Sequence, residues 1–121
     1  YNKPIYITEN GVPDQADALR PGFLLTHLRE VWRAISFCFP VMGYYHWSLV
    51  DNFEWDRGWK LRFGLIEMNP ETQERTMRDS GRLYQEICQN GAISSDMVKR
   101  YAPNLMPILF PGQAPQPIPK K

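Results

Sequence analysis

Two strand-like segments, each followed by a helical pattern, constrain the fold of this chain more than any other feature. Residues 4–8 are β-branched and aromatic, and the two-residue period of a strand puts Ile5, Ile7 and Glu9 on one face. Residues 41–49 are almost continuously apolar or aromatic, which is typical of a strand buried on both faces. The order strand, helix, strand, loop with hairpin, helix predicts an α/β fold of two βα units.

The other elements follow from helical spacing and turn residues. Pro40 ends the first helical pattern, Asp79 and Ser80 are expected to cap the second, and Asn90-Gly91 closes it. The predicted elements are a helix over residues 21–37, a hairpin over 63–68 and 73–76, a helix over 79–90 and a short helix over 94–101. Residues 103–121 contain six prolines, so we expect an extended tail after a folded part over residues 1–102.

Polar residues gather at the carboxyl ends of both predicted strands, the face on which a (β/α)8 barrel builds its active site. Such a barrel has eight strands and about 250 residues, whereas this chain has 121 residues. Two units alone leave open strand edges and an exposed apolar face. The chain also opens on Tyr1 inside its first predicted strand. We therefore expect a piece of a longer protein, incomplete as a stand-alone barrel.

Composition excludes several classes of function. The 14 basic and 13 acidic residues are mixed along the chain, so no basic stripe indicates a nucleic-acid partner. No apolar run approaches the roughly 20 residues of a membrane span. Cys38 and Cys88 fit neither a metal spacing nor a disulfide framework, and we expect buried, inert thiols and a cytoplasmic setting. No metal-ligand cluster or phosphate loop predicts a metal or cofactor.

Glu9 is the first candidate for chemistry, because it lies where the first strand gives way to the turn at Asn10-Gly11. Retaining glycoside hydrolysis uses two carboxyl groups about 5–5.5 Å apart, one of them a rigidly aimed nucleophile. The end of a buried strand provides such rigidity. A structural salt bridge would explain a Glu at this position equally well, and spacing alone leaves both readings open.

A second patch is dense in aromatic side chains: Trp47, Phe53, Trp55, Trp59 and Phe63. Aromatic faces suit the C–H faces of sugar rings, and Asp51, Asn52 and Glu54 could hydrogen-bond to sugar hydroxyls. Alternatively, the aromatic residues cover the barrel top and the acids pair with nearby basic side chains: Arg57, Lys60 and Arg62.

The motifs at residues 7–11, 43–55 and 62–65 together resemble the C-terminal quarter of a family 1 glycoside hydrolase. Residues 20–28 and 72–80 are similar to that family's linking segments, so the resemblance runs from about residue 4 to residue 90. It implies strands 7 and 8 of a (β/α)8 TIM barrel, the last two βα units, with their loops and helices. It also implies a non-proline cis peptide bond after Trp47.

By this resemblance Glu9 is the nucleophile of a retaining, double-displacement β-glycosidase. Trp47, Glu54, Trp55 and Phe63 would line the subsite for the non-reducing sugar, with Glu54 bridging two of its hydroxyls. The family's Asn-Glu-Pro motif, which supplies the acid/base, has no counterpart in this chain. The implied partners are therefore a β-glycoside substrate and a complementary N-terminal barrel polypeptide, without which we expect no activity.

Glu54 also narrows the implied substrate. Relatives that act on 6-phosphorylated sugars usually carry Ser at this position and a nearby Lys, so Glu54 favours unphosphorylated β-glucosides or β-galactosides. Cys38 stands where relatives often have Gly, which we interpret as a matter of packing. His27 is expected to be structural, and His46 to point toward the helical layer rather than act as a base.

Two further hypotheses remain open from the sequence. One is a barrel relative that binds a sugar or a protein without turnover, since a family fold does not guarantee a function. The other is a purely structural piece of an assembled or nicked protein.

Overall fold

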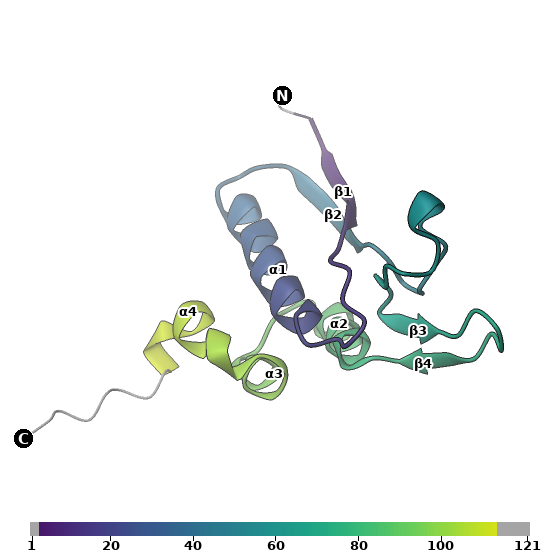
Figure 1. Cartoon of the computed structure of the whole chain (residues 1–121). Coiled ribbons are helices and arrows are strands. Elements are labelled where there is room, and N and C mark those ends of the chain that lie inside the picture. Colours follow the sequence, from purple (N-terminus) through teal and green to yellow (C-terminus); the bar gives the residue numbers. More distant parts are fainter. Residues whose placement is uncertain (1–2, 114–121) are drawn as a thin grey trace, which may run out of the picture.

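The computed structural model describes residues 3–113 and contains an α/β arrangement (Figure 1). Its elements are β1 (Ile5–Asn10), α1 (Arg20–Ser36), β2 (Val41–His46), β3 (Ile66–Met68), β4 (Arg75–Met77), α2 (Asp79–Asn90), α3 (Ser95–Tyr101) and α4 (Met106–Leu109). Short 3₁₀ turns occupy residues 55–57, 103–105 and 111–113. The predicted helices, strands and hairpin are present with small shifts at their ends.

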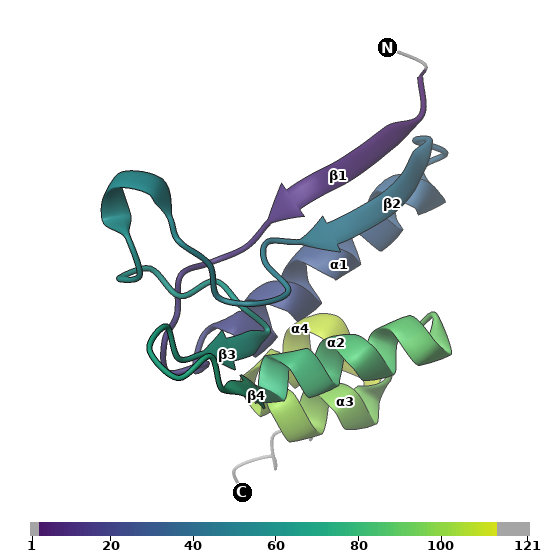
Figure 2. The same ribbon diagram turned by 90° about the vertical axis from the view of Figure 1, so that its right-hand side faces the viewer.

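Strands β1 and β2 pair in parallel, and α1 connects them. Figure 2 shows the two strands side by side, with both carboxyl ends on the side where the loop after β2 projects. This is the geometry expected of adjacent βα units. Tyr6, Met42 and Tyr45 are exposed, which confirms the exposed apolar face predicted for two units alone; the burial on both faces that the pattern of residues 41–49 indicates is absent from this chain by itself. Neither a third strand nor a facing layer within residues 3–113 covers them.

The pairing of β1 with β2 is irregular next to Glu9. Ile7 pairs with Tyr44 and Asn10 pairs with His46, so β1 advances three residues while β2 advances two. Such a β-bulge re-aims side chains and is frequent beside active sites. Simple alternation therefore does not carry from Ile7 to Glu9, and that both share one face stays a prediction.

The hydrophobic core lies between the helices. Its buried residues come from α1, α2 and the C-terminal segment: Leu25, Leu83, Met97, Val98, Ala102 and Met106. The extended tail predicted from residue 103 is thus wrong as far as residue 113, because short helical turns follow and bury Met106. Pro103 and Pro107 begin these turns, where a missing N–H costs nothing. Residues 114–121, the rest of that prediction, lie outside the described residues.

Helix ends follow the expected chemistry with one exception. Arg78 is the N-cap of α2, so Asp79 and Ser80 lie in its first turn rather than capping it. Gly91 ends α2 in the left-handed conformation, and the Ser94 hydroxyl accepts a hydrogen bond from the Met97 amide at the start of α3, both as predicted.

Both cysteines differ from their predicted environment. Cys38 and Cys88 are free and exposed rather than buried. Cys38 has a φ of 64°, a left-handed conformation that favours glycine. Because the Cys38 side chain is exposed, backbone conformation and not packing constrains the residue at this position, and our packing interpretation is wrong.

Candidate active site

The carboxyl ends of β1 and β2 are fastened together directly beside Glu9. The Trp47 amide donates to the Asn10 carbonyl at 3.0 Å, which continues the strand pairing past β2. A side chain on Gly11 would overlap the Trp47 carbonyl oxygen, so only glycine allows this approach of the two backbones. The peptide bond between Trp47 and Ser48 is cis, as the resemblance implied.

The two faces of the sheet differ in their neighbours. The Tyr44 hydroxyl donates to Asn10 Oδ1 at 2.9 Å, and the rings of Tyr44 and His46 both lie 6.4 Å from that of Tyr84 in α2. These side chains therefore face the helices. Glu9 precedes Asn10 and Trp47 follows His46, where the bulge in β1 and the cis peptide bond after Trp47 interrupt the regular alternation of strand side chains.

His46 occupies the helical side, as predicted. It is buried, and its Nε2 lies 3.3 Å from the carbonyl oxygen of Phe63. Burial lowers its pKa to about 4, an effect that nearby Arg20 reinforces. The imidazole is consequently neutral near pH 7.

The loop after β2 folds back so that Glu54 meets Trp47. The indole Nε1 of Trp47 donates to Glu54 Oε1 at 3.2 Å. A tight turn holds the Glu54 backbone, whose amide donates to the Gly58 carbonyl at 2.8 Å. Trp55 begins the 3₁₀ turn and is 85% exposed. The loop thus joins one predicted sugar-binding acid to one predicted aromatic residue.

Asp51 has the second of the two roles that the sequence left open, pairing with a basic side chain. It is buried, and its carboxylate accepts two hydrogen bonds from the Arg78 guanidinium at 3.0 and 3.1 Å and one from the Gly64 amide at 2.8 Å. Such an enclosed group is not available to sugar hydroxyls; for Asp51 the alternative reading, pairing with a nearby basic side chain, is confirmed by Arg62 at 3.7 Å. Sequence reasoning missed Arg78 altogether, because no local motif links residues so far apart.

The five predicted site residues are therefore only partly brought together by direct contacts. Trp47 and Glu54 share a hydrogen bond, and Glu9 is joined to them only through its neighbour Asn10, whose carbonyl accepts the Trp47 amide. Phe63 is half-buried, and its carbonyl accepts from the Ser48 amide at 3.2 Å. Glu9 is exposed, and neither Glu9 nor Glu54 enters an ion pair within residues 3–113, so the salt-bridge reading of Glu9 finds no support.

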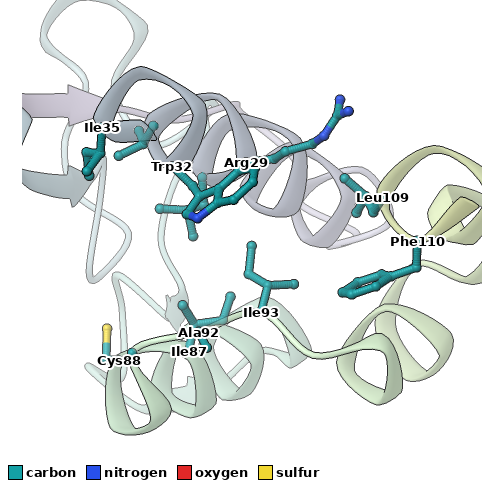
Figure 3. Close-up of a pocket in the computed structure, with 12 residues that line it drawn as sticks. Arg29, Trp32, Ile35, Ile87, Cys88, Ala92, Ile93, Leu109 and Phe110 are labelled. Carbon is teal, nitrogen blue, oxygen red and sulfur yellow. The ribbon is translucent and has the colours of Figure 1, made fainter. Parts of the chain in front are cut away.

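A cavity of about 580 Å³ lies elsewhere, between α1, α2 and the segment after α4 (Figure 3). Its lining is apolar and includes Trp32, Ile35, Ile93 and Phe110, with Arg29 the one charged residue. Among residues 3–113, none that lines it is a carboxylate. The cavity therefore lacks the acid pair that glycoside chemistry requires.

Two kinds of feature are absent from residues 3–113. None of their helices combines the length and apolar character needed to cross a bilayer. No cluster of three His, Cys, Asp or Glu side chains among them could hold a metal ion.

The sequence itself matches a known family. Residues 1–92 match the model described as Glycosyl hydrolase family 1. The chain belongs to glycosyl hydrolase family 1. A β-galactosidase of Saccharolobus solfataricus is 44% identical over 97 residues, which cover 80% of this chain and 20% of that relative.

Solved structures of this family agree. A β-glycosidase from Pyrococcus horikoshii has a TM-score of 0.80 and 42% identity, over 84% of this chain and 24% of its own. A hyperthermophilic β-glucosidase from Pyrococcus furiosus has a TM-score of 0.81 and 39% identity, over 87% and 22%. The chain thus has the fold of a part of these TIM-barrel glycosidases and spans about a fifth of their length.

Proposed function

We propose that this chain is the nucleophile-bearing part of a retaining β-glycosidase, with Glu9 as the nucleophile. The observation that carries the proposal is the junction at the strand ends. There Asn10, the residue after Glu9, accepts the backbone amide of Trp47, and the Trp47 indole is hydrogen-bonded to Glu54. A carboxylate next to an aromatic–acid pair provides both a nucleophile and groups that hold a sugar.

In the proposed double displacement, a Glu9 oxygen attacks the anomeric carbon while the bond to the leaving oxygen breaks. An acid on another part of the barrel protonates that oxygen. The same group, now a base, takes a proton from water, and the water displaces Glu9 to release the sugar. General acid–base help of this kind is worth about 10²–10⁴-fold.

The glycone subsite in this proposal consists of Trp47, Glu54, Trp55 and Phe63. The exposed face of Trp55 is free to stack on a sugar ring, and Glu54 has one carboxylate oxygen left after its bond to Trp47. The negative charge of Glu54 repels a 6-phosphate, so unphosphorylated β-glucosides and β-galactosides are the proposed substrates.

The open sheet supports a further part of the proposal, a complementary polypeptide that supplies the remaining strands and the acid/base. Strands β1 and β2 would then be strands 7 and 8, the last two of the barrel. We call this chain together with that polypeptide the barrel-completed enzyme. The free, exposed thiols of Cys38 and Cys88 favour a reducing, cytoplasmic setting.

A mechanism-based 2-deoxy-2-fluoro-β-glucoside tests the assignment of Glu9. We expect intact mass spectrometry of the barrel-completed enzyme to show one added sugar, and peptide mapping to find it on Glu9. Glu9→Gln is expected to abolish both the adduct and turnover, whereas Glu67→Gln, at an exposed Glu in β3, leaves both unchanged.

Two outcomes would overturn the proposal. An adduct on another residue, or turnover by Glu9→Gln at the native rate, excludes Glu9 as the nucleophile. Sugar binding with neither adduct nor turnover would instead support the non-catalytic binding protein that the sequence left open.

A further inference from the structure

The base of the loop that carries Glu54 is closed around one buried carboxylate. Asp51 lies at the start of this loop and accepts the amide of Gly64 at its end. Its second oxygen accepts from Arg78 at 3.0 Å and from the Met68 amide at 3.4 Å. Arg62 lies 3.7 Å from the same oxygen. One side chain therefore joins both ends of the loop to the hairpin and to α2.

The two backbone segments at the base of the loop are held close together by hydrogen bonds. The Leu65 amide donates to the Ser48 carbonyl at 3.0 Å, and the Asp51 amide donates to the Ile66 carbonyl at 3.0 Å. A Cβ on Gly64 would overlap the Asp51 amide nitrogen. The two ends of the loop are thus in direct contact.

Arg78 is held as firmly as Asp51. Its guanidinium also donates to the Gly64 carbonyl at 2.6 Å, and its amide donates to the Leu65 carbonyl at 3.0 Å. The adjoining turn of α2 is fixed by Asp17, which accepts from the amide and hydroxyl of Ser80 at 2.8 and 2.6 Å. The pair therefore connects the loop to a rigid frame.

A buried ion pair of this kind is a poor source of stability. Asp51 is 2% exposed and Arg78 is 6% exposed, so both charges have lost most of their hydration. Apolar residues of similar volume often stabilise a fold as well as or better than a buried pair. Two parallel hydrogen bonds do, however, fix the orientation of the carboxylate relative to the guanidinium, which apolar packing does not.

We propose that Asp51 and Arg78 are positioning residues that hold Glu54 in register with the sugar. Glu54 follows Asp51 by three residues, and its other tether is the hydrogen bond from Trp47. Loosening the Asp51 anchor lets the loop shift and weakens the bond from Glu54 to a sugar hydroxyl. The inference rests on the proposed function, because it assigns the pair a role in that sugar subsite.

Two substrates make the inference measurable: p-nitrophenyl β-glucoside and its 6-deoxy analogue. The 6-hydroxyl is the group tested, because the proposed function places Glu54 where its charge would repel a 6-phosphate. A hydrogen bond to a charged group is worth about 1.5–3 kcal/mol, so native enzyme should prefer the glucoside by roughly 10- to 150-fold in kcat/KM. This ratio does not depend on the fraction of enzyme that is folded.

The experiment compares Asp51→Asn and Arg78→Lys in the barrel-completed enzyme. Asn keeps the size of Asp51 but not its charge, and Lys keeps the charge of Arg78 but not its two parallel donors. We expect each variant to lower the glucoside preference at least ~5-fold, mainly by lowering kcat/KM for the glucoside. Arg82→Lys is the matched control, because its 4.0 Å pair with Asp79 on the same helix is exposed.

The outcomes separate this inference from the proposed function. A preference that stays native in both variants overturns the positioning role, even if their activity or stability falls. If Asp51→Asn does not fold, the ratio in Arg78→Lys decides alone. If the native enzyme neither turns over the glucoside nor forms the Glu9 adduct, the proposed function fails first, and the positioning role falls with it.

Discussion

At the scale of single residues, Cys38 has an unfavourable backbone conformation, and its thiol has no role in the proposed chemistry. Its φ of 64° places a side chain in the left-handed region directly after α1, and the thiol is exposed. For residues other than glycine this conformation costs about 1–2 kcal/mol. A glycine at this position would avoid that cost, but it would lose more conformational entropy on folding, so the net gain in stability is smaller.

We therefore predict that Cys38→Gly stabilises the barrel-completed enzyme by roughly 1 kcal/mol relative to Cys38→Ala. The alanine variant is the matched control, because it also removes the thiol but keeps the strained Cβ. The free energy of unfolding in urea measures the difference. Equal stability of the two variants would show that the backbone conformation carries no cost.

The sequence predicted the roles of residues whose partners are close in the chain better than the roles of residues whose partners are distant. Glu54 and Trp47 are close in the chain, so their motif predicted a shared subsite, and their hydrogen bond is consistent with it. Asp51 belongs to the same motif, for which the sequence left both sugar binding and ion pairing open; its partner Arg78, 27 residues away, decides for ion pairing. A motif indicates which residues matter together; only tertiary contacts decide which of them face solvent.

At the scale of elements, hydrophobic periodicity predicted α1 and α2 almost to the residue, because each helix packs one apolar face. Periodicity failed where the conformation of a segment depends on the distant segment that it packs against. The bulge beside Glu9 arises from pairing with β2, and the turns after Pro103 form because Met106 enters the helical core. Neither partner can be read from the local sequence.

The junction of β1 and β2 yields a prediction at this scale. Gly11→Ala would press a Cβ against the Trp47 carbonyl and push the strand ends apart. We expect at least ~10²-fold lower kcat, because a shift of about 1 Å costs that much. Gly22→Ala is the matched control, since its Cβ would meet only Leu105 at an ordinary 3.6 Å.

Steady-state kinetics of the barrel-completed enzyme and the rate of Glu9 labelling measure this effect. If Gly11→Ala labelled Glu9 at the native rate, the close approach of the two backbones would not matter for the position of the nucleophile.

At the scale of the whole molecule, the chain combines helices that bury a hydrophobic core with a sheet whose edges are unpaired. The helices share a closed core around Leu25, Leu83 and Val98, whereas the sheet has two strands, two open edges and exposed aromatic residues such as Tyr6 and Tyr45. The sequence predicted this imbalance correctly, because two βα units cannot close a barrel. Stability should differ between the two parts accordingly.

Hydrogen exchange on the isolated chain tests this division. We expect amides of α1, α2 and α3 around the core to be protected, and those of β1 and β2 to exchange at least ~10-fold faster, because their outer edges lack partners. In the barrel-completed enzyme, added neighbouring strands should protect β1 and β2 as strongly as the helices. Equal protection of strands and helices in a monomeric, isolated chain would mean that the two-stranded sheet is stable unaided. The need for a complementary barrel polypeptide would then lose its physical basis.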